Sequence, residues 1–256
     1  MTDATYAMVR VIFGKQLVLL KRYWINTVSN VATSYVMFLL LVFGGRAVAP
    51  TTLGESLAGL IVGFFLWSLS FSAFQGPANT ISTEASWGTL EQLYASPHPF
   101  RRVVGVEVAS SVLFGFLTSL LLLAAMTLTA GISLAFDPLT VVPLVVLTLL
   151  PVAGMGLAFG GLALVYKRIS QVFLLVQFLL LVGIAARGSV LTWAIPLNLG
   201  SRLLTTAMSE GVGLAGLPPV ALGVLVVKAV GFPLAGGVAF AVAVRAARRR
   251  GVMGHY

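Results

Sequence analysis

Two of the few acidic side chains in this chain lie in one polar segment. The chain has 256 residues and only seven Asp and Glu, and Glu84 and Glu91 fall within the segment 81–97. Ser82 or Thr83 can cap a helix in this segment. Residues seven apart share one face of a helix, as the two glutamates do here. A short helix that leads with acids is suited to docking in the groove of a partner protein.

The same segment carries an apolar face. Leu90, Leu93 and Tyr94 follow one another at positions i, i+3 and i+4, which is helical spacing. A helix lying on the lipid surface is the alternative to docking on a partner. Carboxylates are unfavourable next to the anionic lipids of the cytoplasmic leaflet, however. The residues by themselves leave both interpretations open.

Patterns for catalysis or nucleotide binding are missing from the sequence. Gly14-Lys15 is followed by Gln16 and lacks the upstream glycine of a phosphate-binding loop. Two histidines and no cysteine leave few metal ligands and nucleophiles. We therefore expect this chain to be no enzyme and to bind no metal or cofactor. If it uses ATP, a separate ATPase must hydrolyse it.

The composition excludes a water-soluble enzyme. Hydrophobic residues make up 59% of the chain and charged residues 9%, with a mean hydropathy of +1.03. Soluble domains carry about a quarter charged residues. The sequence therefore predicts an all-α integral membrane protein. Its net charge of +9 is then a signal for orientation in the membrane and does not indicate a nucleic-acid surface.

Long charge-free runs predict six transmembrane helices. A span needs about 20 mostly apolar residues to cross about 30 Å of hydrocarbon. We place the spans near residues 25–45, 57–76, 106–130, 140–165, 169–187 and 219–243. They form one transmembrane domain, 25–243, between an N-terminal segment, 1–24, and a basic tail, 244–256.

The basic residues predict that both termini are cytoplasmic. Only Arg46, Arg187 and Arg202 fall on the opposite side, and Lys228 lies within a span. By the positive-inside rule, the more basic side is cytoplasmic, which requires an even number of spans. The twelve residues on that side are Arg10, Lys15, Lys21, Arg22, Arg101, Arg102, Lys167, Arg168, Arg245, Arg248, Arg249 and Arg250.

The N-terminal segment interleaves apolar and basic residues. Met8, Val9, Ile12, Phe13, Leu17 and Leu20 follow helical spacing. We expect a helix that lies in the cytoplasmic interface and ends at an aromatic anchor, Tyr23-Trp24. A frayed basic tail is the alternative.

Two ionisable residues fall inside predicted spans. Glu107 lies just inside the cytoplasmic boundary, and Lys228 lies roughly 14 Å deep, nine residues after Pro219. Such residues usually face the protein interior or a wet cavity, so both are candidates to line a translocation path. The alternatives are snorkelling of Lys228 and pairing of Glu107 with Arg101 or Arg102.

Small and aromatic residues in the spans predict packing contacts. Gly156 and Gly160 stand in a G-x-x-x-G relation, which allows close helix approach within one subunit or at a dimer seam. The second predicted span is rich in aromatic side chains, which form either an apolar path or a packed surface. These are Phe64, Phe65, Trp67, Phe71 and Phe74.

The polar segment also resembles a known signature. Glu84, the run 87–93 and Ser96-Pro97 match the pattern E-x-x-x-G-T-x-E-x-L-x-x-[ST]-P. This pattern resembles that of ABC-2 type permeases, the membrane subunits of ABC exporters in the drug, sodium and lipo-oligosaccharide or polysaccharide branch. The position after the second span and the length of the chain agree with this family.

The resemblance implies the architecture of a type V exporter. It implies that residues 1–24 are a connecting helix, that 81–97 form a coupling helix against the ATPase, and that 188–218 supply two short re-entrant helices. The coupling residues implied in this way are Glu84, Trp87, Gly88, Thr89, Leu90, Glu91, Leu93 and Tyr94.

The resemblance also implies the function and the partners. The chain would be a permease subunit in the plasma membrane, working as a dimer with a second permease copy and with ATPase subunits that bind ATP and Mg²⁺. An ion-gradient-driven secondary transporter is the alternative, but such proteins usually carry acids near the membrane midplane. A membrane-embedded enzyme would need clustered His, Asp or Glu. The sequence does not name the transported substrate.

Overall fold

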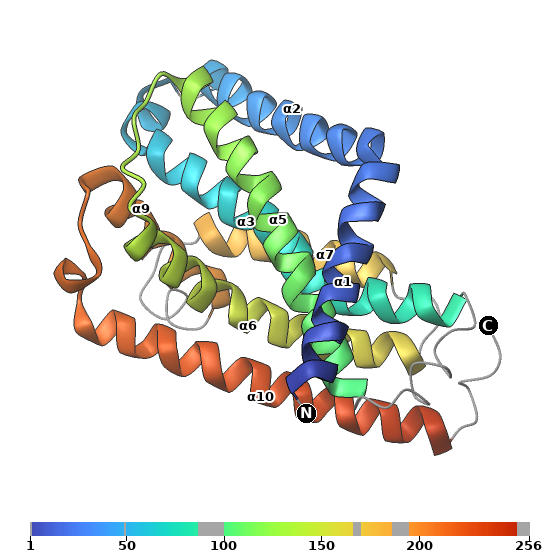
Figure 1. Ribbon diagram of the computed structural model, residues 1–256. Coiled ribbons are helices and arrows are strands. Elements are labelled where there is room, and N and C mark those ends of the chain that lie inside the picture. Colours follow the sequence, from blue (N-terminus) through green and yellow to red (C-terminus); the bar gives the residue numbers. More distant parts are fainter. Residues whose placement is uncertain (1, 49, 87–99, 166–169, 186–194, 250–256) are drawn as a thin grey trace.

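The computed structural model describes residues 2–48, 50–86, 100–165, 170–185 and 195–249. Within these ranges all regular structure is helical (Figure 1). The helices are α1 (Thr2–Arg22), α2 (Trp24–Val48), α3 (Pro50–Ser86), α5 (Phe100–Ala130), α6 (Pro138–Val165), α7 (Ser170–Ala185), α9 (Pro196–Glu210), the short 3-10 helix η1 (Leu214–Gly216) and α10 (Pro219–Arg249).

Five helices in the described ranges are long and apolar enough to cross a membrane. Their apolar stretches are Trp24–Gly44, Leu57–Gly76, Ala109–Ala130, Pro138–Ala163 and Pro219–Ala246. The sequence predicted each of them to within a few residues, which confirms five of the six expected spans as helices. This make-up indicates a multi-pass membrane protein. The last helix continues to Arg249, and the predicted basic tail, 244–256, stays a prediction.

The sixth predicted span, 169–187, is described only in part. Helix α7 has 16 residues, and its apolar part runs over Gln171–Ile184. Residues 169, 186 and 187 of the predicted span lie outside the described residues. A sixth full-length span at this place therefore stays a prediction.

Helix α3 lies at the centre of the protein. It packs against α2, α5, α6, α7 and α9, and 67% of its apolar stretch is buried. A helix that is apolar on every side is stable only when other helices surround it or lipid does. Here helices surround it, so its aromatic side chains form the core.

Aromatic contacts extend from α3 to four neighbouring helices. The ring of Phe64 lies 5.8 Å from that of Phe38 on α2, and the ring of Phe65 lies 6.4 Å from that of Phe116 on α5. Phe74 contacts Phe159 of α6 at 5.5 Å and Phe173 of α7 at 5.4 Å between ring centroids. Aromatic pairs at such distances add to the packing energy. The aromatic residues of the second span therefore pack in the core of this chain.

Helices α6 and α10 lie side by side along most of their length (Figure 1). They touch through glycine backbones. A Cβ atom on Gly236 of α10 would overlap the carbonyl oxygen of Gly154 on α6, and a Cβ on Gly154 would lie 2.5 Å from backbone atoms of Phe232 and Pro233. No side chain fits between the two backbones at this point.

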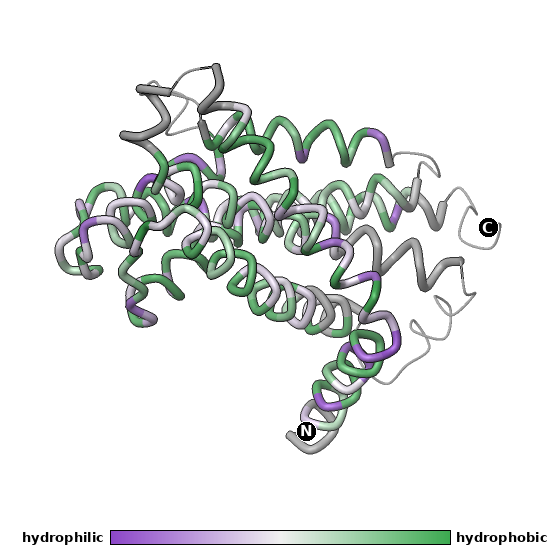
Figure 2. Tube along the Cα trace, turned by 90° about the horizontal axis from the view of Figure 1, so that it is seen from above, coloured by the Kyte–Doolittle hydropathy of each residue, from purple (hydrophilic) through white to green (hydrophobic). Residues whose placement is uncertain are grey.

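The outer helices expose apolar side chains. Only 11% of the apolar stretch of α2, 22% of that of α5 and 28% of that of α10 are buried. Figure 2 shows hydrophobic colouring along most of the helical tubes, whereas the helix at the N label alternates hydrophilic and hydrophobic turns. Exposed apolar surface on this scale is typical of contact with lipid or with another subunit.

Helix α1 runs across the long axis of α6 and α10 in Figure 1. It packs on α5, where the ring of Phe13 lies 6.3 Å from that of Phe114, and its Ile12 is buried. Leu17 and Leu20, predicted on the apolar face, are exposed. The apolar face of α1 is therefore divided between α5 and the surroundings.

Helix α9 holds the end of α7 inside the protein. The last four carbonyls of a helix have no partner in that helix, and a buried end needs a donor from elsewhere. Asn198, which is fully buried, donates its side-chain amide to the carbonyls of Gly183 at 2.6 Å and Ile184 at 3.4 Å. This contact fixes where α7 meets α9.

Removing this donor is expected to destabilise the protein. Asn198→Leu keeps the side-chain size but leaves two buried carbonyls without their donor, at a cost of about 1–3 kcal/mol. The temperature at which half of the protein in detergent is no longer monodisperse should fall by several degrees. Asn30→Leu, at an exposed position on α2, is the matched control and should leave the midpoint unchanged. Equal midpoints for the two variants would contradict the role of Asn198.

Candidate functional site

The predicted coupling segment begins at the end of α3. Glu84 lies in the last turn of this helix, which ends at Ser86, and α5 begins at Phe100. Ser82 and Thr83 lie inside α3 and do not begin a separate helix, because no Gly or Pro interrupts residues 78–86. The other predicted coupling residues lie outside the described residues: Trp87, Gly88, Thr89, Leu90, Glu91, Leu93 and Tyr94.

Three helices finish at the same end of the bundle. Helices α3, α6 and α10 all end toward the side where the C label lies (Figure 1). The predicted coupling segment follows α3 at this end, and Arg245 lies exposed near the end of α10. The described first residues of the segment, 81–86, and the end of α10 that carries Arg245 therefore share one end of the molecule.

The opposite end of the bundle is held by hydrogen bonds between helices and the connections beside them. The amide of Ala135 donates to the carbonyl of Met208 at 2.7 Å, and the amide of Leu214 donates to Thr140 Oγ1 at 3.3 Å. Asp137 accepts from Thr140 Oγ1 at 2.5 Å and caps the start of α6. These contacts join the α5–α6 connection to α9, and η1 to the start of α6.

A buried polar cluster ties the middle of α3 to α7. Trp67 Nε1 donates to the carbonyl of Gln177 at 3.0 Å, and Gln177 Nε2 donates to Ser70 Oγ at 2.6 Å. Ser70 Oγ in turn donates to the carbonyl of Trp67 at 2.6 Å. Sequence reasoning missed this cluster, although a glutamine within an apolar stretch was a usable signal. Hydrogen bonds in an apolar interior hold two helices in a fixed register.

Lys228 is buried in the structure. Its ammonium Nζ donates to the carbonyl of Ile195, the residue before α9, at 3.1 Å. The side chain therefore links α10 to the start of α9 and does not extend to an open surface. Its contact with a transported substrate stays a prediction.

Glu107 lies in α5, between its second and third turns. Its side chain lies outside the described part of the structure, so both its place in a path and its pairing with arginine stay predictions. Among the described residues, no three His, Asp or Glu side chains gather at one point as a metal site would require.

The two glycines of the G-x-x-x-G pair are both buried in α6. A Cβ on Gly156 would overlap the carbonyl oxygen of Phe74 on α3. The close approach at Gly156 therefore lies within this chain, between α6 and α3. Gly160 follows one turn later on the same helix.

Comparisons with models of known families, with curated proteins and with solved structures gave no match. The functional argument for this chain therefore rests on its residues and on its geometry.

Helix α3 is the element that connects the candidate sites. It runs without a break over 37 residues, which is about 55 Å. Its far end carries Glu84, and its middle is held by the core and by the Trp67–Gln177 contact. Gly76-Pro77 lies between these two parts, and the proline removes one backbone hydrogen bond from the helix.

Proposed function

We propose that this chain is the membrane-spanning permease subunit of an ATP-driven exporter of the ABC-2 type. Its helices form the translocation path, and the segment 81–97 binds a separate ATPase subunit. Two copies of the permease work with two ATPase subunits, which hold the ATP and Mg²⁺. The observation that carries this proposal is the continuity of α3, from the buried core of the protein to the first residues of the acidic signature.

Further features support this arrangement. Helix α1 runs across the bundle axis (Figure 1), as expected of a connecting helix that lies in the cytoplasmic interface with its basic residues toward water. Helices α2, α3, α5, α6, α7 and α10 then alternate in direction, with α7 as a short fifth crossing. Both termini face the cytoplasm in this arrangement, in the plasma membrane.

Helix α9 fits the role of a re-entrant helix. It has 15 residues, ten of them buried, and is therefore too short to cross a bilayer. It begins with Pro196 and ends at Gly211, whose φ of 67° is left-handed, so that both ends are sharply defined. A short helix at membrane depth is tolerated where protein surrounds it, as it does here.

The proposed mechanism follows from the packing of α3. ATP binding closes the two ATPase subunits, which displaces the coupling segment. Helix α3 transmits the displacement to α5, α6, α7 and α9, against which it packs. These helices tilt as rigid bodies and open the path outward, because packed helices shift between discrete arrangements.

Capture of the full chain from its native membrane tests the proposal. The sequence has no phosphate-binding loop, so ATP hydrolysis in the eluate must come from a partner. We expect the eluate to hydrolyse ATP and to contain a second protein with such a loop. An eluate that holds only this chain, and transport that persists in ATP-depleted vesicles under an ion gradient, would contradict the proposal.

A further inference from the structure

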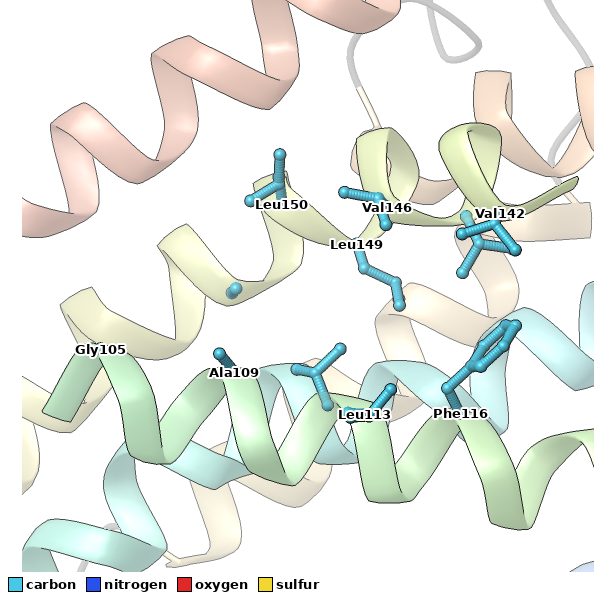
Figure 3. Close-up of a pocket in the computed structure, with 11 residues that line it drawn as sticks. Gly105, Ala109, Leu113, Phe116, Val142, Val146, Leu149 and Leu150 are labelled. Carbon is cyan, nitrogen blue, oxygen red and sulfur yellow. The ribbon is translucent and has the colours of Figure 1, made fainter. Parts of the chain in front are cut away.

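An apolar groove lies between α5 and α6 (Figure 3). Both helices pack on α3, and the space left between them has a volume of about 450 Å³. The two helices run in opposite directions along it, so that Gly105 and Leu150 lie toward one end and Phe116 and Val142 toward the other (Figure 3).

The lining of this groove has no polar side chain. All eleven lining residues are Gly, Ala, Val, Leu or Phe, and they lie on helices α5 and α6. Ligand sites for polar molecules place a few donors or acceptors among their apolar residues. This groove offers none, so the part of a ligand that lies in it must be hydrocarbon.

The groove is continuous with the apolar exterior. Its rim residues Leu113 and Val146 are 46% and 49% exposed. Along α5 the rim continues into Leu117 and Leu121, which are also exposed. Most lining residues fall within the apolar stretches Ala109–Ala130 and Pro138–Ala163. In a bilayer, this groove therefore opens to the acyl chains around the protein.

The length of the groove suits an acyl chain. The lining residues extend over twelve positions on each helix, from 105 to 116 and from 142 to 153, which is about 16 Å. A single acyl chain is thin enough to lie along it.

Two basic residues precede the groove in the sequence of α5. The sequence puts Arg101 and Arg102 in the first turn of α5, one turn before Gly105. Basic residues next to an apolar surface attract anionic lipid headgroups.

We propose that the groove between α5 and α6 is a binding site for one acyl chain of an anionic phospholipid. The bound acyl chain fills the space between α5 and α6, and both helices pack on α3. This proposal requires only that the chain spans a membrane, and it holds whether or not an ATPase is the partner.

Photolabelling in vesicles tests the site. The full chain is reconstituted in phosphatidylcholine vesicles that contain phosphatidylglycerol with a diazirine in the middle of one acyl chain. Cross-linked peptides are then mapped by mass spectrometry. We expect the labels to concentrate on groove residues such as Val112 and Leu149. Labels spread evenly over the exposed positions of α5, α6 and α10 would overturn the proposal.

A matched pair of variants sharpens the test. Ala109→Trp places an indole in the groove, whereas Ala124→Trp makes the same change at an exposed position on α5 outside it. Labelling of the groove should fall about tenfold in the first variant, which corresponds to a loss of about 1.4 kcal/mol of binding, and should not change in the second. Val146→Trp repeats the change from α6. Undiminished labelling of the groove in both groove variants would overturn the proposal.

A benzoylphenylalanine in place of Leu113 distinguishes lipid from a second copy of the chain. Attachment of the lipid to this position supports the site. A covalent dimer through this position would overturn it, since the groove would then be an interface between subunits.

Discussion

Glu91→Lys is expected to lower capture of the ATPase partner by about a hundredfold. Removal of one charge from a buried pair at an interface costs about 2–5 kcal/mol of binding free energy. Reversal of the charge at Glu91 adds repulsion between the lysine and the basic group of the partner. Glu84→Lys should act in the same direction, since it reverses the other acid of the segment. The measurement is the ATP hydrolysis that is recovered with the affinity-captured chain.

The control for these variants is Glu210→Lys. Glu210 is exposed at the end of α9, on the opposite side of the bundle from the end of α3. The same reversal of charge there should leave the captured activity at its wild-type level. Equal losses in Glu91→Lys and Glu210→Lys would indicate a general effect of charge, and full capture by Glu91→Lys would refute coupling through this segment.

Gly236→Ala is expected to be the most destabilising of the glycine-to-alanine substitutions in α10. Its Cβ would overlap the carbonyl of Gly154, and a backbone carbonyl on a packed helix cannot rotate away. Overpacking of this kind costs typically about 1–3 kcal/mol, so the unfolding midpoint in detergent should fall by several degrees and α6 and α10 should separate.

The adjacent residue gives a control with the same chemistry. A Cβ on Gly237 meets nothing within 4 Å, and alanine is favoured over glycine in a helix by about 0.5–1 kcal/mol. Gly237→Ala should therefore leave the midpoint unchanged or raise it slightly. A midpoint for Gly236→Ala as high as that for Gly237→Ala would show that the two helices do not meet at this glycine.

The long spans were predictable because their signal is local. A charge-free apolar run of about 20 residues has few stable alternatives to a transmembrane helix. The second span, predicted at 57–76, matches the apolar stretch Leu57–Gly76. A full-length crossing at 169–187 stays a prediction, because the structure describes only helix α7 (Ser170–Ala185) there. The contact of α7 with Asn198 was not predictable from a local pattern, because Asn198 lies on another helix.

The contacts that hold the candidate site could not be predicted from one sequence. The glycines of α6 indicated close packing, but not that Gly154 meets Gly236 of α10 while Gly156 meets α3. Trp67 and Gln177 are 110 residues apart, and no local pattern pairs them. The acidic signature could be recognised because its residues are contiguous in the sequence. Helix α3 continues into the first residues of the signature because no Gly or Pro occurs between residues 78 and 86.

Site-specific cross-linking tests coupling through the segment 81–97 most directly. Benzoylphenylalanine replaces Tyr94 in the segment or, as a matched aromatic control, Phe136 at the opposite end of the bundle, where the side chain is exposed. After irradiation of native membranes, an ATPase with a phosphate-binding loop should be attached to the chain through position 94 and not through position 136. Absence of an ATPase at position 94, or equal attachment at both positions, would contradict the assignment of this chain as a coupled permease.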